Sequence, residues 1–475
     1  MNRFVDVAVI GAGHAGLNAI KEIRKLTDSY VLINGGALGT TCARIGCMPS
    51  KVAIHLAETY QKRTAFDRYG ISGASDIRIN HSEALEHVRD LRDTFVDLVL
   101  ANTTDEMDEE HLLEGYAEFT GSDTLKVGDD FITANAIIIA TGACSVIPET
   151  WRKFADGILT VDTLFEQETL PESIAVIGLG PIGIEIGQAL HRMGVSVIGI
   201  EKGETISRLA DPAINRTAHD ILNREFPLWL GEGPDIQRDG DQFIVRAGDQ
   251  EARVDKLFLA LGRRPNLDRL GLDRLNVQFD MNGLPRHDPV SLKVDGLPVY
   301  LAGDAAGGIA SLQRATEQGR IAGYNAVHRK PICFRQKTPM SIIFTDPNIA
   351  VVGKQWSELD PRSKVVAQRR FGPVGRAMIM GQNRGMIRVY ADRKNRKILG
   401  AAMVGARAEH LAHLISWAIE VGMTVDRALE MPFYHPVIEE ALQEVLHDLQ
   451  KELSSENKIR YVFFHRSEEQ STLGA

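Results

Sequence analysis

The sequence predicts an α/β protein in which one strand–helix–strand unit occurs twice and a smaller α+β region comes after it. The first unit reads FVDVAVI, then GAGHAG, a helical stretch and the strand YVLIN. From Pro171 the same order returns as SIAVIGLGPIGIEIGQALHRMGVSVIGIE. Continuous β-branched runs joined by helices are typical of buried parallel strands. Beyond the second unit, strand patterns come first and helical patterns come later, which indicates an α+β layer.

The remaining elements are predicted from the same kinds of pattern. Residues 47–66 and 80–113 have helical patterns, and residues 115–140 turn to strands that end in AIIIATG. A further helix is expected from about Ser311 to Val327. The last region contains the strand patterns MSIIFTDPNIAVVG, GMIRVY and ILGAAMVG, and then helices from about 407 to 452.

Length and composition argue against several classes of protein. The 475 residues are enough for two to four domains. A formal net charge of -9 disfavours nucleic acid or an anionic membrane as a partner. No apolar run approaches the roughly 18 residues of a membrane span, and a strand starting near Phe4 leaves no room for a targeting peptide. Four cysteines are too few for a secreted disulfide scaffold, so a cytoplasmic location is expected.

Both units contain a GxGxxG turn between a strand and a helix. The glycines are Gly11, Gly13 and Gly16 in the first unit and Gly178, Gly180 and Gly183 in the second. In such a turn the first glycine allows the bend, the second lets the backbone approach a pyrophosphate, and the third lets the helix pack on the strand. Two copies, each with a second strand after the helix, therefore predict two dinucleotide sites.

The two second strands end in different side chains. Glu201 ends the second copy, where a carboxylate accepts hydrogen bonds from a ribose 2′-hydroxyl and repels a 2′-phosphate. NAD is therefore favoured over NADP, although Lys202 weakens this preference. Asn34 ends the first copy and can still bond a ribose, but less strongly than a carboxylate.

A close cysteine pair, Cys42 and Cys47, lies in the segment GTTCARIGCMPSK (39–51). A zinc site would need two further ligands at suitable spacing, and none accompanies this pair, so no metal is expected. Cys47 precedes a predicted helix whose dipole favours a thiolate. Two nucleotide sites beside two thiols suggest an electron relay with a flavin as converter, and two inert thiols are the weaker alternative.

Taken together, the motifs resemble those of the flavin-dependent pyridine nucleotide–disulfide oxidoreductases of class I, from about residue 4 to residue 450. The matching stretches are GAGHAG, GTTCARIGCMPSK, AIIIATG, GLGPIGIE, LALGRRPN, YLAGDAAG, FTDPNIA and HPVIEE. The resemblance implies two Rossmann-like domains, for FAD and NAD, and an α+β C-terminal dimerisation domain. The expected boundaries are 1–148 and 269–335 for FAD, 149–268 for NAD, 336–453 for dimerisation and 454–475 for a flexible tail.

The resemblance also implies a role for each reacting side chain. Cys42 would be the thiol that meets the substrate, and Cys47 would lie against the flavin. His435 would take a proton from the substrate, with Glu440 holding the imidazole. In this family the histidine comes from the other subunit, so a homodimer with a shared active site is expected.

Further residues would contact the cofactors by the same resemblance. Lys51 would lie beside the flavin and pair with Glu185, although an ordinary surface ion pair is the alternative. Asp304 would bond the ribityl chain. The remaining expected contacts are Ala117 and Leu312, through their backbone at FAD, and the turns at Gly142 beside FAD and Gly262 beside NAD.

The implied reaction is oxidation of a dihydrolipoyl group, free or on a carrier protein, with NAD+ as acceptor. The alternative is an NAD(P)H-dependent reductase of another disulfide, such as a low-molecular-weight thiol. A purely structural or sensing flavoprotein is disfavoured by the complete Cys/Cys/His/Glu set. The sequence departs from the family pattern at Asn34, at Arg44 between the cysteines, and at Phe433, Tyr434 and Val437 around the histidine.

Overall fold

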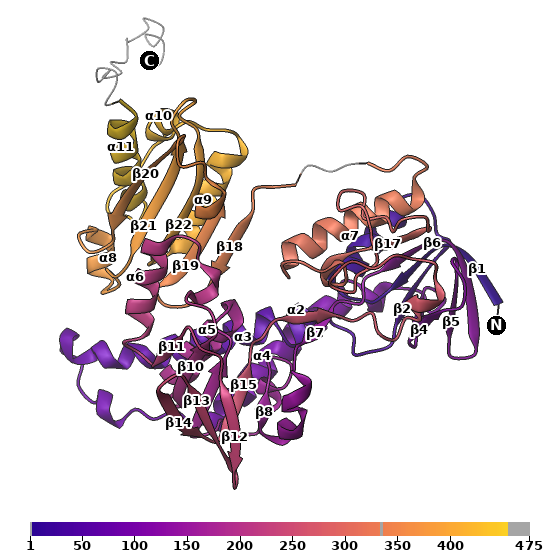
Figure 1. Ribbon diagram of the computed structural model, residues 1–475, viewed down its shortest axis with the longest axis horizontal. Coiled ribbons are helices and arrows are strands. Elements are labelled where there is room, and N and C mark those ends of the chain that lie inside the picture. The colour runs from indigo at the N-terminus through magenta and orange to yellow at the C-terminus, as the bar shows by residue number, and fades with distance from the viewer. Residues whose placement is uncertain (1, 333–335, 455–475) are drawn as a thin grey trace, which may run out of the picture. The chain divides into compact units, whose positions relative to one another are not determined.

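The computed structural model describes residues 2–332 and 336–454, so the expected tail lies almost wholly outside the described residues. The chain divides into two compact units. The first unit contains the chain up to Arg208 together with Leu222–Gln336. The second contains Leu209–Ile221 together with the chain from Lys337 onward. The elements of each unit are labelled in Figure 1.

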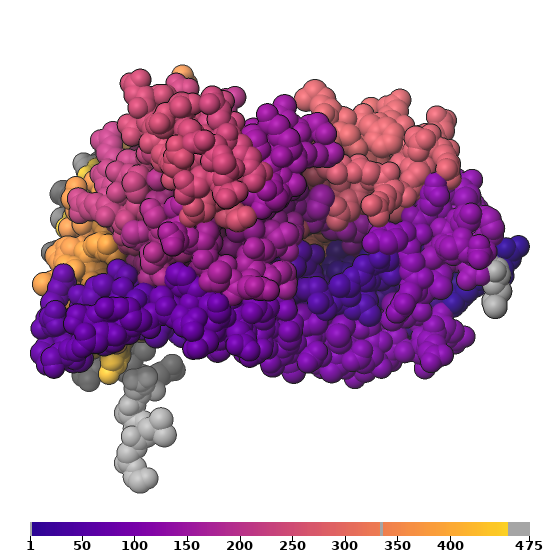
Figure 2. Space-filling view, turned by 90° about the horizontal axis from the view of Figure 1, so that it is seen from below, coloured from indigo at the N-terminus to yellow at the C-terminus, as the bar shows by residue number. Residues whose placement is uncertain are grey.

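A seven-stranded sheet in the first unit is built from both ends of that unit's sequence. Its order is β3–β2–β1–β6–β5–β4, with β17 beside β6. The strands are β1 (Asn2–Ile10), β2 (Tyr30–Asn34), β3 (Leu112–Glu114), β4 (Ala117–Phe119), β5 (Thr124–Val127), β6 (Asp130–Ile139) and β17 (Val299–Leu301). Helix α7 (Leu312–Val327) packs against α1 (His14–Ile23). Figure 2 shows the salmon surface of the later segment beside the indigo and purple surface of the chain's beginning.

The composition of β1 reflects its central place in this sheet. It pairs in parallel with β2 on one side and β6 on the other. Val7 and Val9 pack into the core layer that contains α1, whereas Val5 and Ala8 pack into the layer on the opposite face. Because both faces are covered, the strand is a continuous apolar run rather than an alternating one. The predicted parallel α/β arrangement is confirmed here.

A five-stranded parallel sheet contains the second strand–helix–strand unit. Its order is β11–β10–β9–β15–β8. The strands are β8 (Ile158–Leu159), β9 (Ser173–Ile177), β10 (Ser196–Glu201), β11 (Leu228–Leu230) and β15 (Lys256–Leu259), and α5 (Pro181–Arg192) joins β9 to β10. Two small antiparallel sheets accompany it and were not predicted. They are β12 (Asp235–Asp239), β13 (Gln242–Ala247) and β14 (Gln250–Val254), and β7 (Ala143–Ser145) with β16 (Arg263–Pro265).

The helical region between β2 and β3 differs from expectation at one end. Short α2 (Thr41–Arg44) precedes α3 (Cys47–Gln61) and a 3₁₀ segment, Lys62–Tyr69. Helix α4 (His81–Ala101) begins as predicted, because the Asn80 side chain accepts from two backbone N–H groups of its first turn. It ends well before residue 113, since the chain must turn back to pair β3 with β2.

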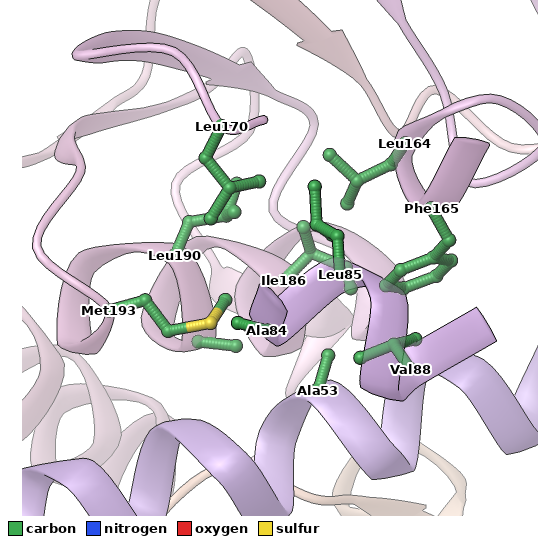
Figure 3. A pocket seen from close by; sticks show the side chains of 11 residues that line it. Ala53, Ala84, Leu85, Val88, Leu164, Phe165, Leu170, Ile186, Leu190 and Met193 are labelled. Carbon is green, nitrogen blue, oxygen red and sulfur yellow. The ribbon is translucent and has the colours of Figure 1, made fainter. Parts of the chain in front are cut away.

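Helices α3, α4 and α5 pack through apolar side chains. They enclose a cavity of about 10 Å³ whose lining includes Ala53, Leu85, Val88 and Leu190 (Figure 3). A buried water needs polar partners as well as space of this size, and this lining is apolar. The cavity is therefore a dry packing defect and no ligand site. The apolar contacts around it hold α3, the helix that begins at Cys47, against α5.

The second unit is an antiparallel sheet with helices, as the α+β prediction requires. Its order is β18–β19–β22–β21–β20. The strands are β18 (Met340–Ile343), β19 (Asn348–Gly353), β20 (Lys364–Arg370), β21 (Met386–Asp392) and β22 (Ile398–Gly405). The helices are α6 (Pro212–Leu222), α8 (Gly375–Ile379), α9 (Ala408–Glu420), α10 (Val425–Leu429) and α11 (Glu440–Ser454). Strand β20 was not predicted; it packs against α11.

A buried carboxylate explains why α6 belongs to the second unit. Asp211, 2% exposed, accepts a hydrogen bond from the backbone of Ala213 at the start of α6. It also accepts from Arg388 and from the Tyr390 hydroxyl on β21, each at 2.5 Å. One side chain therefore caps the helix and fastens it to the sheet.

Among the described residues, no helix is long and apolar enough to cross a bilayer.

Candidate active site

The first glycine turn is fixed by backbone contacts at two of its three glycines. Gly11 has φ of +108°, and a Cβ there would lie 2.4 Å from the carbonyl oxygen of Ala140. A Cβ on Gly16 would lie 1.9 Å from the carbonyl oxygen of Gly11. At Gly13 the nearest atom to an added Cβ is 3.9 Å away. Only the second glycine therefore faces open space, where a pyrophosphate binds in such turns.

The second turn repeats this arrangement with different neighbours. Gly178 has φ of +92°, and its Cβ would lie 2.6 Å from the carbonyl oxygen of Ala260. The Cβ of Gly183 would lie 1.9 Å from the carbonyl oxygen of Gly178, while a Cβ on Gly180 would meet nothing within 4 Å. Both turns thus contain a space next to the second glycine that the chain itself does not fill, as two dinucleotide cofactors require.

The side chains at the ends of β2 and β10 hold the turns in place. The amide oxygen of Asn34 accepts from the backbone N–H of Ala12 at 3.1 Å. In the second unit Glu201 accepts from the equivalent N–H, that of Leu179, at 2.9 Å. The other Glu201 oxygen accepts from Gly203 N–H at 3.1 Å. Glu201 therefore sits at the strand end where a nucleotide ribose is expected, with its charge shared by two backbone donors.

A cavity of about 380 Å³ opens at the carboxyl ends of β2 and β3. Its lining consists of Asn34, Gly35, Gly36, Leu38, Leu112, Glu114, Gly115 and Tyr116. Its volume is in the range of small-molecule sites, and the ends of parallel strands are where nucleotides bind in α/β sheets. The aromatic ring of Tyr116 packs on Gly35, where a Cβ would lie 2.6 Å from it. These features fit the adenosine end of FAD.

Polar groups near β6 and β17 fit the ribityl and flavin part of FAD, away from the adenosine end. Asp304 lies in a 3₁₀ turn directly after β17. Burial raises the pKa of the Asp304 carboxyl, and the positive charges of Arg263 and Arg314 oppose that rise. The Thr141 hydroxyl after β6 is buried and has no hydrogen-bond partner among the described residues. A buried hydroxyl of this kind is expected to bond a bound molecule.

Cys42 and Cys47 are both thiols in the structure, and each shifts the pKa of the other. The Cys42 thiol donates a hydrogen bond to the Cys47 sulfur, and this bond raises the pKa of Cys42. The same bond lowers the pKa of Cys47 to about 7, with help from the charge of Lys51. Cys47 is also the first residue of α3, where the helix dipole favours a negative charge. At neutral pH, Cys42 is therefore protonated, while the Cys47 sulfur is about half ionised.

The ion pair between Lys51 and Glu185 joins the two nucleotide-binding parts of the first unit. The Lys51 Nζ lies 2.8 Å from a Glu185 oxygen. Lys51 is on α3, one turn after Cys47, and Glu185 is on α5, just after the second glycine turn. The Glu185 side chain is only 6% exposed, so this is a partly buried pair rather than a solvated surface contact.

In the second unit, His435 and Glu440 form the expected contact. The His435 Nδ1 lies 2.7 Å from a Glu440 oxygen. The other Glu440 oxygen accepts from the backbone N–H of Val437 at 3.3 Å. These contacts lower the pKa of the Glu440 carboxyl, chiefly through the histidine. With Nδ1 held by a carboxylate, Nε2 is left to exchange a proton, and the His435 side chain is 78% exposed.

The remaining predicted residues lie at or near the ends of strands and helices of the first unit, and their cofactor contacts stay predictions. Ala117 opens β4 and Leu312 opens α7, while Gly142 and Gly262 come shortly after β6 and β15 with φ of +68° and +102°. Sequence patterns missed Glu114, Thr141 and the two arginines near Asp304. Thr141 and Arg263 stand inside the motifs AIIIATG and LALGRRPN, so a closer comparison could have found them. Glu114 has no such signal, because only strand pairing brings it to Asn34.

Comparison with known families gives matches over most of the chain. Residues 5–319 match the family described as Pyridine nucleotide-disulphide oxidoreductase. Residues 339–446 match the dimerisation domain of the same family.

Curated relatives and solved structures are similar over nearly the whole chain. A dihydrolipoyl dehydrogenase of Thermus scotoductus is 28% identical and aligns over 94% of this chain and 98% of its own. A mercuric reductase of Bacillus cereus is 27% identical over 94% of this chain and 72% of its own. The flavoprotein disulfide reductase RclA of Escherichia coli has a TM-score of 0.82 at 21% identity, covering 94% and 99%. LpdA of Mycobacterium tuberculosis has the same TM-score and identity, covering 94% and 100%.

Proposed function

Because this chain belongs to the pyridine nucleotide-disulphide oxidoreductase family, we propose that it is a dihydrolipoamide dehydrogenase, which oxidises a dihydrolipoyl dithiol with NAD+ as acceptor. The coarser conclusion, a flavoprotein disulfide oxidoreductase that uses FAD and NAD, rests on the family itself. The finer conclusion, dihydrolipoamide dehydrogenase, depends on whether the dithiol substrate is a dihydrolipoyl group. Six curated relatives that are 25–28% identical over most of the chain carry the dihydrolipoyl dehydrogenase name, and two others carry the mercuric reductase name.

The observation that carries the proposal is the polarised thiol pair. A disulfide relay needs one sulfur that exchanges with the substrate and a second that is a thiolate on the cofactor side. The hydrogen bond from Cys42 to Cys47 separates the two roles, because it raises the pKa of Cys42 and lowers the pKa of Cys47 to about 7. FAD, when bound, supplies a carrier that converts between thiol and nicotinamide chemistry.

The proposed reaction begins with the cysteine pair as a disulfide. His435 accepts a proton from one substrate thiol, and the resulting thiolate attacks the Cys42 sulfur, which breaks the Cys42–Cys47 bond and releases Cys47 as a thiolate. The second substrate thiol then attacks the mixed disulfide and frees Cys42, which takes up the proton. The substrate leaves as a cyclic disulfide, and two electrons remain on the cysteine pair. NAD+ finally accepts these electrons as a hydride, and the disulfide re-forms with release of a proton.

Lys51 has an electrostatic role in this scheme. Its ammonium group lowers the pKa of Cys47 and therefore stabilises the thiolate that the first exchange releases. Its contact with Glu185 fixes the ammonium between α3 and α5. In this scheme Lys51 supplies the positive charge beside Cys47, and Glu185 holds Lys51 in place.

We also propose that the active unit is a homodimer in which His435 of the partner subunit serves the cysteines of the first. The match of residues 339–446 to the family's dimerisation domain supports association. Helix α9 supports it too, since Leu414, Trp417 and Val421 are 39%, 67% and 72% exposed at spacings that place them along one side of the helix. Large apolar side chains gathered in this way are typical of an interface between subunits.

The test is NAD+ reduction by dihydrolipoamide with the purified flavoprotein, with NADP+ in a parallel reaction. We expect turnover with NAD+ and little with NADP+. Cys42→Ser and Cys47→Ser should abolish it while FAD stays bound. His435→Gln should lower the rate by about 10²- to 10⁴-fold, as loss of a general base does. His87→Gln, an exposed histidine on α4, is the matched control and should leave the rate unchanged.

Two outcomes would change the assignment. If NADH reduces the cysteine pair but dihydrolipoamide gives no turnover, the relay stands and the substrate is another disulfide. Arg44, whose Nε donates to the Leu38 carbonyl beside the cysteines, and Tyr434, which is 82% exposed, are then the first residues to examine. Turnover by Cys42→Ser at the wild-type rate would rule out the relay itself.

A further inference from the structure

The geometry points to Glu114, on the neighbouring strand, as the residue that accepts hydrogen bonds from the adenosine ribose in the first nucleotide site. Asn34, at the end of β2, would then serve only to hold the glycine turn. This inference depends on FAD as the family cofactor and is independent of which dithiol the enzyme oxidises.

Asn34 is already engaged by the backbone at both ends of its amide. Its oxygen accepts from Ala12 N–H at 3.1 Å, and its nitrogen donates to the Gly36 carbonyl at 2.6 Å. The amide is neutral, so any remaining lone pair is a weaker acceptor than a carboxylate. The side chain is therefore a clamp between the glycine turn and the loop after β2.

Glu114 is placed beside Asn34 by the register of the sheet. In the parallel pairing of β2 with β3, Asn34 is opposite Glu114, and each ends its strand. Paired residues of neighbouring strands point to the same face of a sheet. Both residues line the 380 Å³ cavity at this edge. The Glu114 side chain is exposed. Among the described residues, its carboxylate has no hydrogen-bond or ion-pair partner, so it is available to a ligand.

The second nucleotide unit has the same pair of strand-end positions, but its carboxylate is on the strand that corresponds to β2 and not on the one that corresponds to β3. There Glu201 ends β10, and the residue opposite it at the end of β11 is Leu230. In both units the next residue is a glycine whose N–H donates to the strand-end carbonyl: Gly115 to Asn34 and Gly231 to Glu201, each at 3.0 Å. The two sites are therefore equivalent in backbone, and the acid has moved by one strand in the first.

The surroundings of Glu114 suit a nucleoside. Gly35, Gly36 and Gly115 leave the cavity wall without side chains, so a ribose and a flat base can approach the backbone. Tyr116, two residues after Glu114, has Arg269 over its ring at 5.5 Å, which fixes the aromatic wall of the cavity. A carboxylate at this position would accept from the 2′- or 3′-hydroxyl of the adenosine ribose.

The experiment measures binding of FAD to the flavin-free protein, by quenching of flavin fluorescence, without substrate. The probes are FAD and two analogues that lack the 2′- or the 3′-hydroxyl of the adenosine ribose. For the wild type, we expect at least one analogue to bind roughly tenfold more weakly than FAD, the scale of one hydrogen bond to a charged group. Glu114→Gln should bind FAD roughly tenfold more weakly and should no longer distinguish FAD from that analogue.

Control variants separate recognition from structure. Glu110→Gln changes an exposed acid just before β3 that does not line the cavity, and it should bind all probes as the wild type does. Asn34→Ala should weaken FAD and both analogues alike, because it loosens the turn. The inference is overturned if Glu114→Gln keeps the wild-type preference for FAD over the analogues, or if Asn34→Ala alone removes that preference. Neither result bears on the choice of dithiol substrate.

Discussion

The turn after β1 and the turn after β9 can be compared residue by residue. In both, the first glycine has a positive φ and lies against a carbonyl of the neighbouring strand end, at Ala140 or Ala260. In both, an added Cβ on the third glycine would lie 1.9 Å from the carbonyl oxygen of the first. The residue after the first glycine donates its N–H to the side chain that ends the second strand, which is Asn34 in one unit and Glu201 in the other.

This comparison separates what the backbone demands from what the ligand demands. The first and third glycines are required by distances within the chain, so they are the same in both units. The strand-end side chain needs only an oxygen to hold the turn, and both Asn and Glu provide one. Its charge serves the ribose, and that function can be supplied from a neighbouring strand. A strand-end asparagine is therefore no sign of a lost nucleotide site.

The backbone part of the comparison can be broken with one methyl group. Gly16→Ala and Gly183→Ala each place a Cβ against a backbone carbonyl that cannot move aside. We expect each to lower the free energy of unfolding by more than about 3 kcal/mol, above the usual cost of overpacking. Urea unfolding and flavin content of the purified variants measure the effect.

The second glycines provide the matched controls for this experiment. Gly13→Ala and Gly180→Ala place a methyl in open space at ordinary φ values of -81° and -66°. They should change the free energy of unfolding by less than about 1 kcal/mol and should instead weaken binding of the cofactor in their own unit. Equal loss of stability in all four variants would contradict the assignment of the open space to the cofactors.

The sequence was sufficient where the chemistry is local. Each glycine turn lies within a few residues, so its spacing predicts its local structure. The roles of Cys42, Cys47, His435 and Glu440 were inferred from the resemblance of their short motifs to the family, and spacing alone left the cysteine pair open. It was insufficient where pairing is set by the whole sheet. The helix expected to reach residue 113 stops at Ala101, because β3 is needed beside β2.

Long-range contacts account for the other gaps. Glu114 reaches Asn34 only through the β2–β3 register, across a long insertion that contains three helices. Asp211 looks like an ordinary helix cap in the sequence, and its bonds to Arg388 and Tyr390 depend on a strand far along the chain. Such contacts have no periodic signature, and a single sequence therefore does not reveal them.

The two nucleotide-binding units also differ in the segment after the second strand, because only the first leads into the thiol pair. In the reduced enzyme, the Cys42 hydrogen bond holds the pKa of Cys47 at about 7, below the unperturbed thiol value of 9.0. Cys42→Ala removes the donor, so the pKa of Cys47 should rise. Alkylation of Cys47 by iodoacetamide, measured by mass spectrometry against pH, should then reach half-maximal rate at a higher pH than in the wild type.

Two further variants calibrate this shift. Lys51→Met should also raise the pKa of Cys47, but by less, because the charge of Lys51 is a smaller cause than the hydrogen bond. Cys144→Ser, which removes another thiol of the first unit, should leave the profile unchanged. An unchanged profile in Cys42→Ala would mean that α3 and Lys51 alone set the ionisation of Cys47, and the division of roles between the two sulfurs would have to be abandoned.

The smallest expected effect comes from making the second unit resemble the first at its strand end. In Glu201→Asn, the amide oxygen can still hold the Leu179 N–H, as Asn34 holds that of Ala12. The ribose, however, loses its charged acceptor, and the neighbouring strand offers only Leu230. We expect the affinity for NADH to fall by roughly tenfold, while NADPH gains because the repulsion of its 2′-phosphate disappears.

Calorimetric titration with NADH and NADPH measures both changes, and Glu232→Gln, an exposed acid beyond β11, is the matched control. The double variant Glu201→Asn/Leu230→Glu then copies the arrangement of the first unit, with an amide on one strand and a carboxylate on the next. If strand-end charge can move between strands, this variant should regain part of the NADH affinity that Glu201→Asn lost. If it regains none, the position of the acid matters as well as its presence, and the equivalence of the two sites extends to the backbone only.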